Sequence, residues 1–89
     1  MKKAEFKEII DEGIRRGKEF LAVRIETEGN PGPEIIINPR ENFDAKIKYY
    51  MTAYNDDMEL IKAKEGGKIV KITKVFMTNN FHDFAWFAY

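Results

Sequence analysis

The clearest structural signal in the chain lies in residues 38–54, which read NPRENFDAKIKYYMTAY. A β-branched run at 35–37 stops at the step from Asn38 to Pro39, where a strand should end and a helix begin. We expect Asn38 to be the N-cap, Pro39 the first helical residue and Glu41 the acid of a capping box. The segment therefore predicts a direct joint between a strand and a helix.

The expected helix has one apolar side. Its large apolar residues recur at steps of four, three and four, which places them on one helical face. These residues are Phe43, Ile47, Tyr50 and Tyr54. We expect this face to be buried in the core and Lys46, on another face, to point to water.

The N-terminal segment predicts a second amphipathic helix over residues 2–16. Apolar residues follow the helical spacing, and Gly13 lies among them, which suggests a close approach to a strand. Gly17 is well placed to stop the helix, because glycine readily adopts the left-handed conformation that follows a helix end. This helix should pack its apolar face on a sheet.

Two hairpins are expected, one before and one after the central helix. The first takes residues 19–28, 29–33 and 34–37 as strand, turn and strand, and the second takes 58–64, 65–68 and 69–78. Alternation in the last strand predicts two faces, one with Val70, Ile72 and Phe76 and the other with Ile69, Val75 and Met77. Turn residues at 55–57 end the central helix.

The C-terminal segment, residues 79–89, is aromatic. It contains Phe81, Phe84, Trp86, Phe87 and Tyr89. Asn80 and Asp83 are spaced to cap a short helix, and a fifth strand is the alternative. The expected fold is α+β in the order α-β-β-α-β-β, with residues 1–89 as a single domain. A four-stranded antiparallel sheet carries two helices on one face, and the C-terminal apolar segment closes an end.

Composition limits the function classes. Fifteen acidic and fifteen basic side chains give a formal net charge of zero, which argues against nucleic-acid binding driven by bulk charge. The chain has no cysteine, so it offers neither disulfides nor thiolate metal ligands. Neither a signal peptide nor a membrane-spanning apolar run is evident. We therefore expect a cytoplasmic protein without a membrane partner.

The chain contains few of the residue types that commonly act in catalysis. Serine and cysteine are both missing, and the single histidine, His82, is adjacent to Asp83. Neighbouring side chains point in different directions, so a surface histidine explains this pair better than a base and its orienting acid. The acids at 55–57 and Glu59 fit turn chemistry better than a metal site. We expect no enzyme activity, no cofactor and no bound metal.

Two surfaces are candidates for binding. The first is a basic ribbon of Lys62, Lys64, Lys68, Lys71 and Lys74. Residues 58–78 hold these five lysines against two acids, a net charge of +3. The ribbon would contact a phosphate backbone or an acidic partner, but lysines also protect a sheet edge from aggregation, and we favour that interpretation.

The second candidate surface is aromatic. Trp86, Phe87 and Tyr89 in the tail, with Tyr49 on the central helix, would form an interaction surface if they stay exposed. A partner protein, a second copy of the chain, or the monomer's own core are the alternatives for covering them. A homodimer therefore remains an open alternative at this point.

Residues 38–60 resemble a segment of small uncharacterised accessory proteins of bacteriophages and prophages. The shared pattern is an Asn-Pro entry, Asn-Phe, paired tyrosines, and Ala-Tyr-Asn-Asp-Asp before a strand. The resemblance implies a phage accessory protein in a bacterial cytoplasm, and inhibitors of bacterial defence systems are one subclass of similar size. It assigns no role to any residue.

These observations predict a non-enzymatic protein-interaction module. The alternative is a nucleic-acid-associated protein that uses the ribbon at residues 62–74. A small hydrolase or metal enzyme is the third and weakest hypothesis, because the usual nucleophiles are missing.

Overall fold

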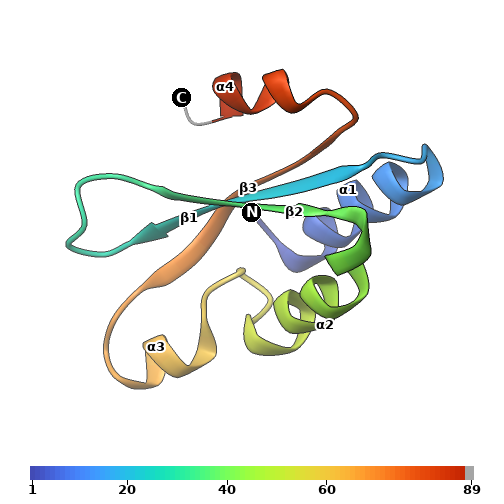
Figure 1. The fold of residues 1–89 in the computed structure, drawn as a ribbon. Helices are drawn as coiled ribbons and strands as arrows, with labels where there is room; N and C mark the ends of the chain where they lie inside the picture. Colours follow the sequence, from blue (N-terminus) through green and yellow to red (C-terminus); the bar gives the residue numbers. More distant parts are fainter. Residues whose placement is uncertain (88–89) are drawn as a thin grey trace.

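The computed structural model describes residues 1–87 and shows an α+β fold (Figure 1). Its elements follow the order α-β-β-α-(α)-β, with short helical turns at the C-terminus. They are α1 (Lys3–Arg15), β1 (Phe20–Thr27), β2 (Glu34–Pro39), α2 (Phe43–Ala53), α3 (Ile61–Glu65), β3 (Val70–Thr78) and α4 (Phe84–Phe87). Among residues 1–87, every helix is too short or too polar to span a bilayer.

The sheet has three antiparallel strands in the order β2-β1-β3. The predicted first hairpin is confirmed, with Val23 of β1 opposite Ile36 of β2. β1 then pairs on its other side with β3, where Val23 faces Val75. β1 is therefore the central strand, and both β2 and β3 lie at edges of the sheet.

α1 and α2 lie on one side of the sheet, as expected (Figure 1). The predicted stripe of α2 faces the core, where Phe43, Tyr50 and Tyr54 are buried and Ile47 is half-buried. The ring of Phe6 from α1 meets the ring of Tyr50 edge to face, with centroids 5.9 Å apart. This contact joins the two helices above the inner face of the sheet.

Gly13 makes the close approach to a strand that its position on the apolar face predicted. A Cβ atom built on Gly13 would lie 2.9 Å from the Cβ of Met77 in β3. Any larger residue would therefore push α1 away from the strand. Gly17 follows the helix with φ +70°, the left-handed conformation expected of a helix-ending glycine.

The prediction of a strand at residues 58–64 was wrong, and the sheet has three strands where four were expected. Residues 61–65 form α3, because Lys, Ala and Glu favour helix and a glycine with φ +81°, Gly67, follows. Only the start of the segment is extended, where Glu59 forms a β-bridge with Lys71. The Gly-Gly pair therefore ends a helix and does not make a hairpin turn.

The predicted faces of the last strand were also wrong in part. The pairing of β1 with β3 shifts by one residue between Arg24 and Ile25, which leaves Thr73 as an extra residue in β3. This bulge places Ile72 on the same side as Val75 and Met77, in the main core. Phe76 lies on the opposite side, against Ala22 and Phe84.

The joint at residues 38–43 is present, but its capping roles differ from the prediction. β2 continues through Pro39, and a 3-10 turn at Arg40–Asn42 precedes α2. Asn38 is buried, and its side-chain oxygen accepts a hydrogen bond from Asn42 (Nδ2 to Oδ1, 3.3 Å). No side-chain cap bond is formed at either helix start, so the capping box was wrong.

The C-terminal segment takes the helical alternative. A 3-10 turn at Phe81–Asp83 leads into α4, and the Asn80 side chain accepts a hydrogen bond from the His82 N–H (3.0 Å). α4 lies across the side of the sheet opposite α1 and α2 (Figure 1), where Phe84 packs against Ala22. The segment thus covers part of the second face, whereas we had expected it to close an end.

Candidate functional site

Of the predicted aromatic surface, the structure describes the side chain of Tyr49. Tyr49 is 48% exposed on α2 and lines a shallow pocket with Leu60, Ile61 and Lys62. α4, which carries the tail, lies on the other side of the sheet (Figure 1). The side chains of Trp86 and Phe87, and all of Tyr89, lie outside the described residues. Tyr49 is therefore exposed on the side of the sheet opposite α4.

The five lysines of the predicted ribbon come from different elements. Lys62 and Lys64 belong to α3, Lys68 to the following turn, and Lys71 and Lys74 to β3. The Lys64 Nζ donates to the Glu59 carboxylate at 2.7 Å, and this contact raises the pKa of Lys64 and lowers the pKa of Glu59. Lys71 pairs across the strands with Glu26. The lysines thus belong to a helix, the segment that follows it, and a strand.

The polar candidates for chemistry serve local structure. Asn55 accepts hydrogen bonds from the N–H groups of Asp57 (2.9 Å) and Glu59 (3.0 Å), which builds the turn after α2. Asp57 forms an ion pair with Lys2, which lowers the pKa of Asp57. Asp83 accepts a hydrogen bond from the Thr78 hydroxyl at 2.6 Å. These contacts support the turn interpretation for residues 55–59.

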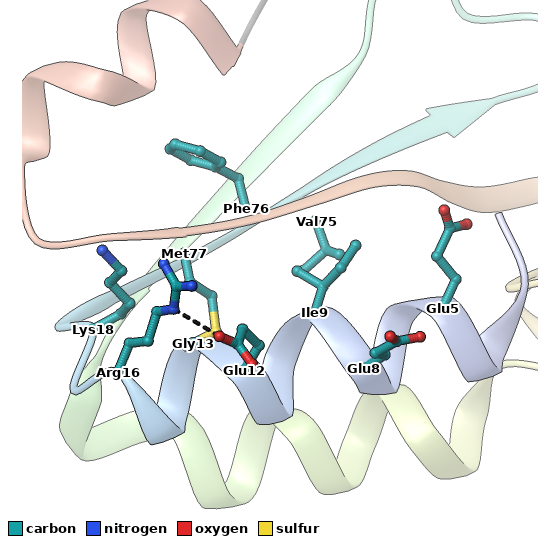
Figure 2. Close-up of a pocket in the computed structure, with 10 residues that line it drawn as sticks. All are labelled: Glu5, Glu8, Ile9, Glu12, Gly13, Arg16, Lys18, Val75, Phe76 and Met77. Carbon is teal, nitrogen blue, oxygen red and sulfur yellow. Dashed lines mark hydrogen bonds and ion pairs between the residues drawn. The ribbon is translucent and has the colours of Figure 1, made fainter.

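A groove that the sequence did not predict lies between α1 and the outer edge of β3 (Figure 2). Its volume is about 740 Å³. One wall is a helical stripe of α1, with Glu5, Glu8, Ile9, Glu12 and Arg16, and the other is residues 75–77 of β3. In Figure 2 the Phe76 side chain points away from α1. Phe76 therefore lines the groove at the edge of the strand and not with its ring.

The first half of this edge is already paired with the chain itself. The Leu60 N–H donates to the Val70 carbonyl (2.7 Å), and the Ile72 N–H donates to the Met58 carbonyl (2.9 Å). Residues 58–60 therefore act as a very short added strand. They occupy the outward-facing backbone groups at the start of β3.

The second half of the edge is open. In an edge strand, the backbone N–H and C=O groups of every second residue face outward. Without a bulge these would be residues 74 and 76, but the extra residue at Thr73 shifts the outward-facing groups to Val75 and Met77. Within residues 1–87, no hydrogen bond from another element reaches the backbone of Val75 or Met77. The groove thus exposes the N–H and C=O groups that a further strand would use.

Charge is distributed unevenly along the groove. Glu5 and Glu8 are exposed at one end, and neither forms an ion pair within the described residues. At the other end Glu12 pairs with both Arg15 and Arg16, and Lys18 adds another positive charge. The groove therefore has an acidic end and a basic end, with Ile9 between them (Figure 2).

One signal in the sequence pointed toward this site. Gly13 predicted that α1 would lie close to a strand, and this closeness makes α1 a wall of the groove. The identity of that strand and its place at the edge depend on strand order, which residue periodicity does not reveal. No family model, curated protein or solved structure matches the chain.

Proposed function

We propose that this protein is a non-enzymatic interaction module that binds an extended segment of a partner protein along the open half of β3. One observation carries the proposal: Val75 and Met77 direct their backbone groups into a groove beside α1. Strand addition to a sheet edge is a recurring mode of peptide recognition. Backbone hydrogen bonds supply affinity, and neighbouring side chains supply specificity.

Two features of the edge support this function. Residues 58–60 already pair with the first half of the same edge, so its geometry accepts an added strand. Sheet edges are normally protected by charged side chains, proline or covering elements. Residues 75–77, Val-Phe-Met, carry neither charge nor proline, and α1 leaves their outer edge accessible in the groove.

The biological setting in this proposal comes from the resemblance of residues 38–60. It places the module among phage or prophage accessory proteins that act in a bacterial cytoplasm. The partner would then be a host or phage protein with an exposed extended segment. A component of a bacterial defence system is one such partner.

Selection from a library of random peptides tests the function without a known partner. We expect the selected peptides to shift the backbone amide NMR signals of residues 73–77 and of Glu5–Glu12, and to leave α2 unaffected. Methylating those peptide nitrogens that face β3 should abolish binding, because the hydrogen-bond donors are removed. Methylating the alternate nitrogens is the matched control and should be tolerated.

Two outcomes would overturn the proposal. In the first, the library yields no binder for the folded protein. In the second, binders shift signals only around Tyr49 and Ile61, which would move the interaction surface to the pocket between α2 and α3.

Nucleic-acid binding is the second candidate function, and one observation favours it. Arg24, Lys71 and Lys74 lie on the side of the sheet opposite α1, with Arg24 and Lys74 paired across the strands. Affinity for DNA or RNA that falls steeply with salt, and that the double variant K71Q/K74Q abolishes, would support this candidate. Lys71→Gln alone, at a residue outside the segment 73–77, should leave peptide binding in the groove intact.

A further inference from the structure

We infer that the groove selects a partner strand that runs antiparallel to β3 and places an acidic residue, an apolar residue and a basic residue at alternate positions, in that order. The inference rests on the proposed function and deepens it, because it names the chemistry of the bound segment. The distribution of charge along α1 and the pairing of residues 58–60 carry it.

α1 and β3 run in the same direction along the groove. Ile9 lies beneath Val75, and Gly13 lies beneath Met77, one step further along both elements (Figure 2). The acidic end, with Glu5 and Glu8, therefore lies toward the start of β3. The basic end, with Arg16 and Lys18, lies toward the end of β3.

The existing pairing on this edge sets the expected direction of the partner. Glu59 forms an antiparallel bridge with Lys71, and antiparallel pairing is slightly more stable per residue than parallel pairing. An antiparallel partner begins beside Met77 and ends beside residue 73. Its first residues therefore meet Arg16 and Lys18, and its last residues meet Glu5 and Glu8.

Spacing along the two elements decides where the partner's charges belong. Glu8 in α1 and Arg16, the residue that directly follows α1, are eight residues apart, a rise of about 12 Å. Four steps along an antiparallel strand cover about 14 Å, so residues i and i+4 of the partner match the two charged ends. Residue i+2 points the same way and falls near Ile9, which calls for an apolar side chain.

A second copy of the chain fits this groove poorly. If the β3 strands of two copies paired, they would lie about 5 Å apart, and each would bring its own α1 beneath it. The two α1 helices would then be too close, because packed helices need about 8–10 Å between their axes. A second β3 would also present no acidic residue, since residues 73–77 read Thr-Lys-Val-Phe-Met. The occupant is therefore a single extended segment without an attached helix.

Two synthetic peptides of identical composition test the inference. The forward peptide carries Asp, Val and Lys at alternate positions from its N-terminus, and the reversed peptide carries Lys, Val and Asp. We expect the forward peptide to bind at least about fivefold more tightly at low salt, since it forms favourable charge pairs where the reversed peptide meets like charges. The difference should shrink as salt screens these pairs.

A variant of the protein supplies the matched control. Glu8→Lys with Arg16→Glu exchanges the charges of the groove. Both positions are exposed, one on α1 and one at its C-cap, so the fold should persist. This variant should prefer the reversed peptide. NMR spectra of the free variant verify that the sheet is unchanged.

The possible results test the charge order of the bound segment separately from the proposed binding of a strand to β3. Equal affinity for both peptides, or preference of the unchanged protein for the reversed peptide, would overturn the charge order while strand addition stands. Failure of both peptides, although library peptides bind at residues 73–77, would overturn the motif. Failure of every peptide would overturn the proposed function itself. A dimer that buries this groove, detected by sedimentation, would overturn the single-strand occupant.

Discussion

The two sides of the sheet are packed very differently. The side that faces α1 and α2 belongs to a continuous core of twelve buried residues among those described, which come from both helices, from β1 and β3, and from the loop after α2. β2 contributes the partly buried Ile36. On the opposite side, among the residues whose burial the structure describes, Ala22 and Phe84 are buried together, with Phe20, Ile35 and Phe76 partly buried beside them. Stability therefore rests mainly on the helical side of the sheet.

This difference shows where the molecule has freedom to vary. The helical side holds α1 firmly against β3, which gives the groove a rigid wall. The opposite side carries charged strand residues, of which Lys71 and Lys74 are exposed and contribute little to packing. Substitutions that disrupt packing on the helical side should destabilise the fold. Substitutions of the charged residues on the opposite side should mainly change the properties of the surface.

Removal of a large side chain from the helical core should have the largest effect. Phe43→Ala should lower the free energy of unfolding by about 3–5 kcal/mol, because it leaves a cavity among buried neighbours. Denaturant melts measure this loss. Lys46, which we expected to point to water, is half-buried, so Lys48→Ala at an exposed position of the same helix is the control and should cost less than about 0.5 kcal/mol. Equal losses at the two positions would contradict the assignment of the buried face.

The tyrosines of the same core should make the protein sensitive to alkali. Burial raises the pKa of Tyr50 and of Tyr54 from 10.0 to about 12, so both phenols stay neutral in the folded state where they would ionise in the unfolded chain. Their contribution is complete below about pH 10 and is lost as pH rises toward 12, at about 1.4 kcal/mol per pKa unit for each group.

Melts between about pH 9 and pH 11.5 test this expectation. Tyr50→Phe should flatten the alkaline loss, because the group that ionises on unfolding is removed. Tyr49→Phe, on the exposed face of α2, should change the profile less, because burial is the main cause of the raised pKa of Tyr50 and Tyr54 and the nearby Tyr49 phenol is a secondary one. An identical alkaline profile for the unchanged protein and for Tyr50→Phe would mean that other groups govern the loss.

The smaller cluster should respond more weakly to truncation. Phe84→Ala should cost at most about 2 kcal/mol, because α4 is short and can settle onto Ala22 to close part of the gap. Hydrogen exchange should show local loosening around Phe20 and Phe76, with the helical core still protected. Phe81→Ala, at a residue that is 59% exposed, is the matched control. A loss as large as that of Phe43→Ala would place α4 in the main folding unit.

Charge removal on the outer surface should have the smallest effect on stability. The triple change of Lys68, Lys71 and Lys74 to Gln should shift the free energy of unfolding by less than about 0.5 kcal/mol. It should increase self-association, because charged residues discourage pairing of sheet edges. Sedimentation across a range of concentrations measures this. A triple variant that stays monomeric would show that these lysines do not protect the edge.

Local sequence patterns were enough to place most elements. The spacing of Phe43, Tyr50 and Tyr54 predicted the buried face of α2, because helical periodicity acts through neighbours only one turn apart. Gly13 predicted close packing of α1, and the turn at 29–33 predicted the first hairpin, for equally local reasons. In contrast, residues 61–65 were misassigned because their alternation of apolar and charged residues is too short to distinguish a strand from a single turn of helix.

Only the tertiary structure decided the strand order, the bulge and the groove. The extra residue at Thr73 appears when β3 pairs with β1, and it reverses which side chains and backbone groups of β3 face outward. Residues 58–60 cover one half of the edge, and α1 lines the other half, although these segments are far apart in the sequence. Whether the edge of a strand is free to bind depends on which segments pair beside it. These segments are distant in the sequence, so their pairing does not appear in the periodicity of the strand's own residues.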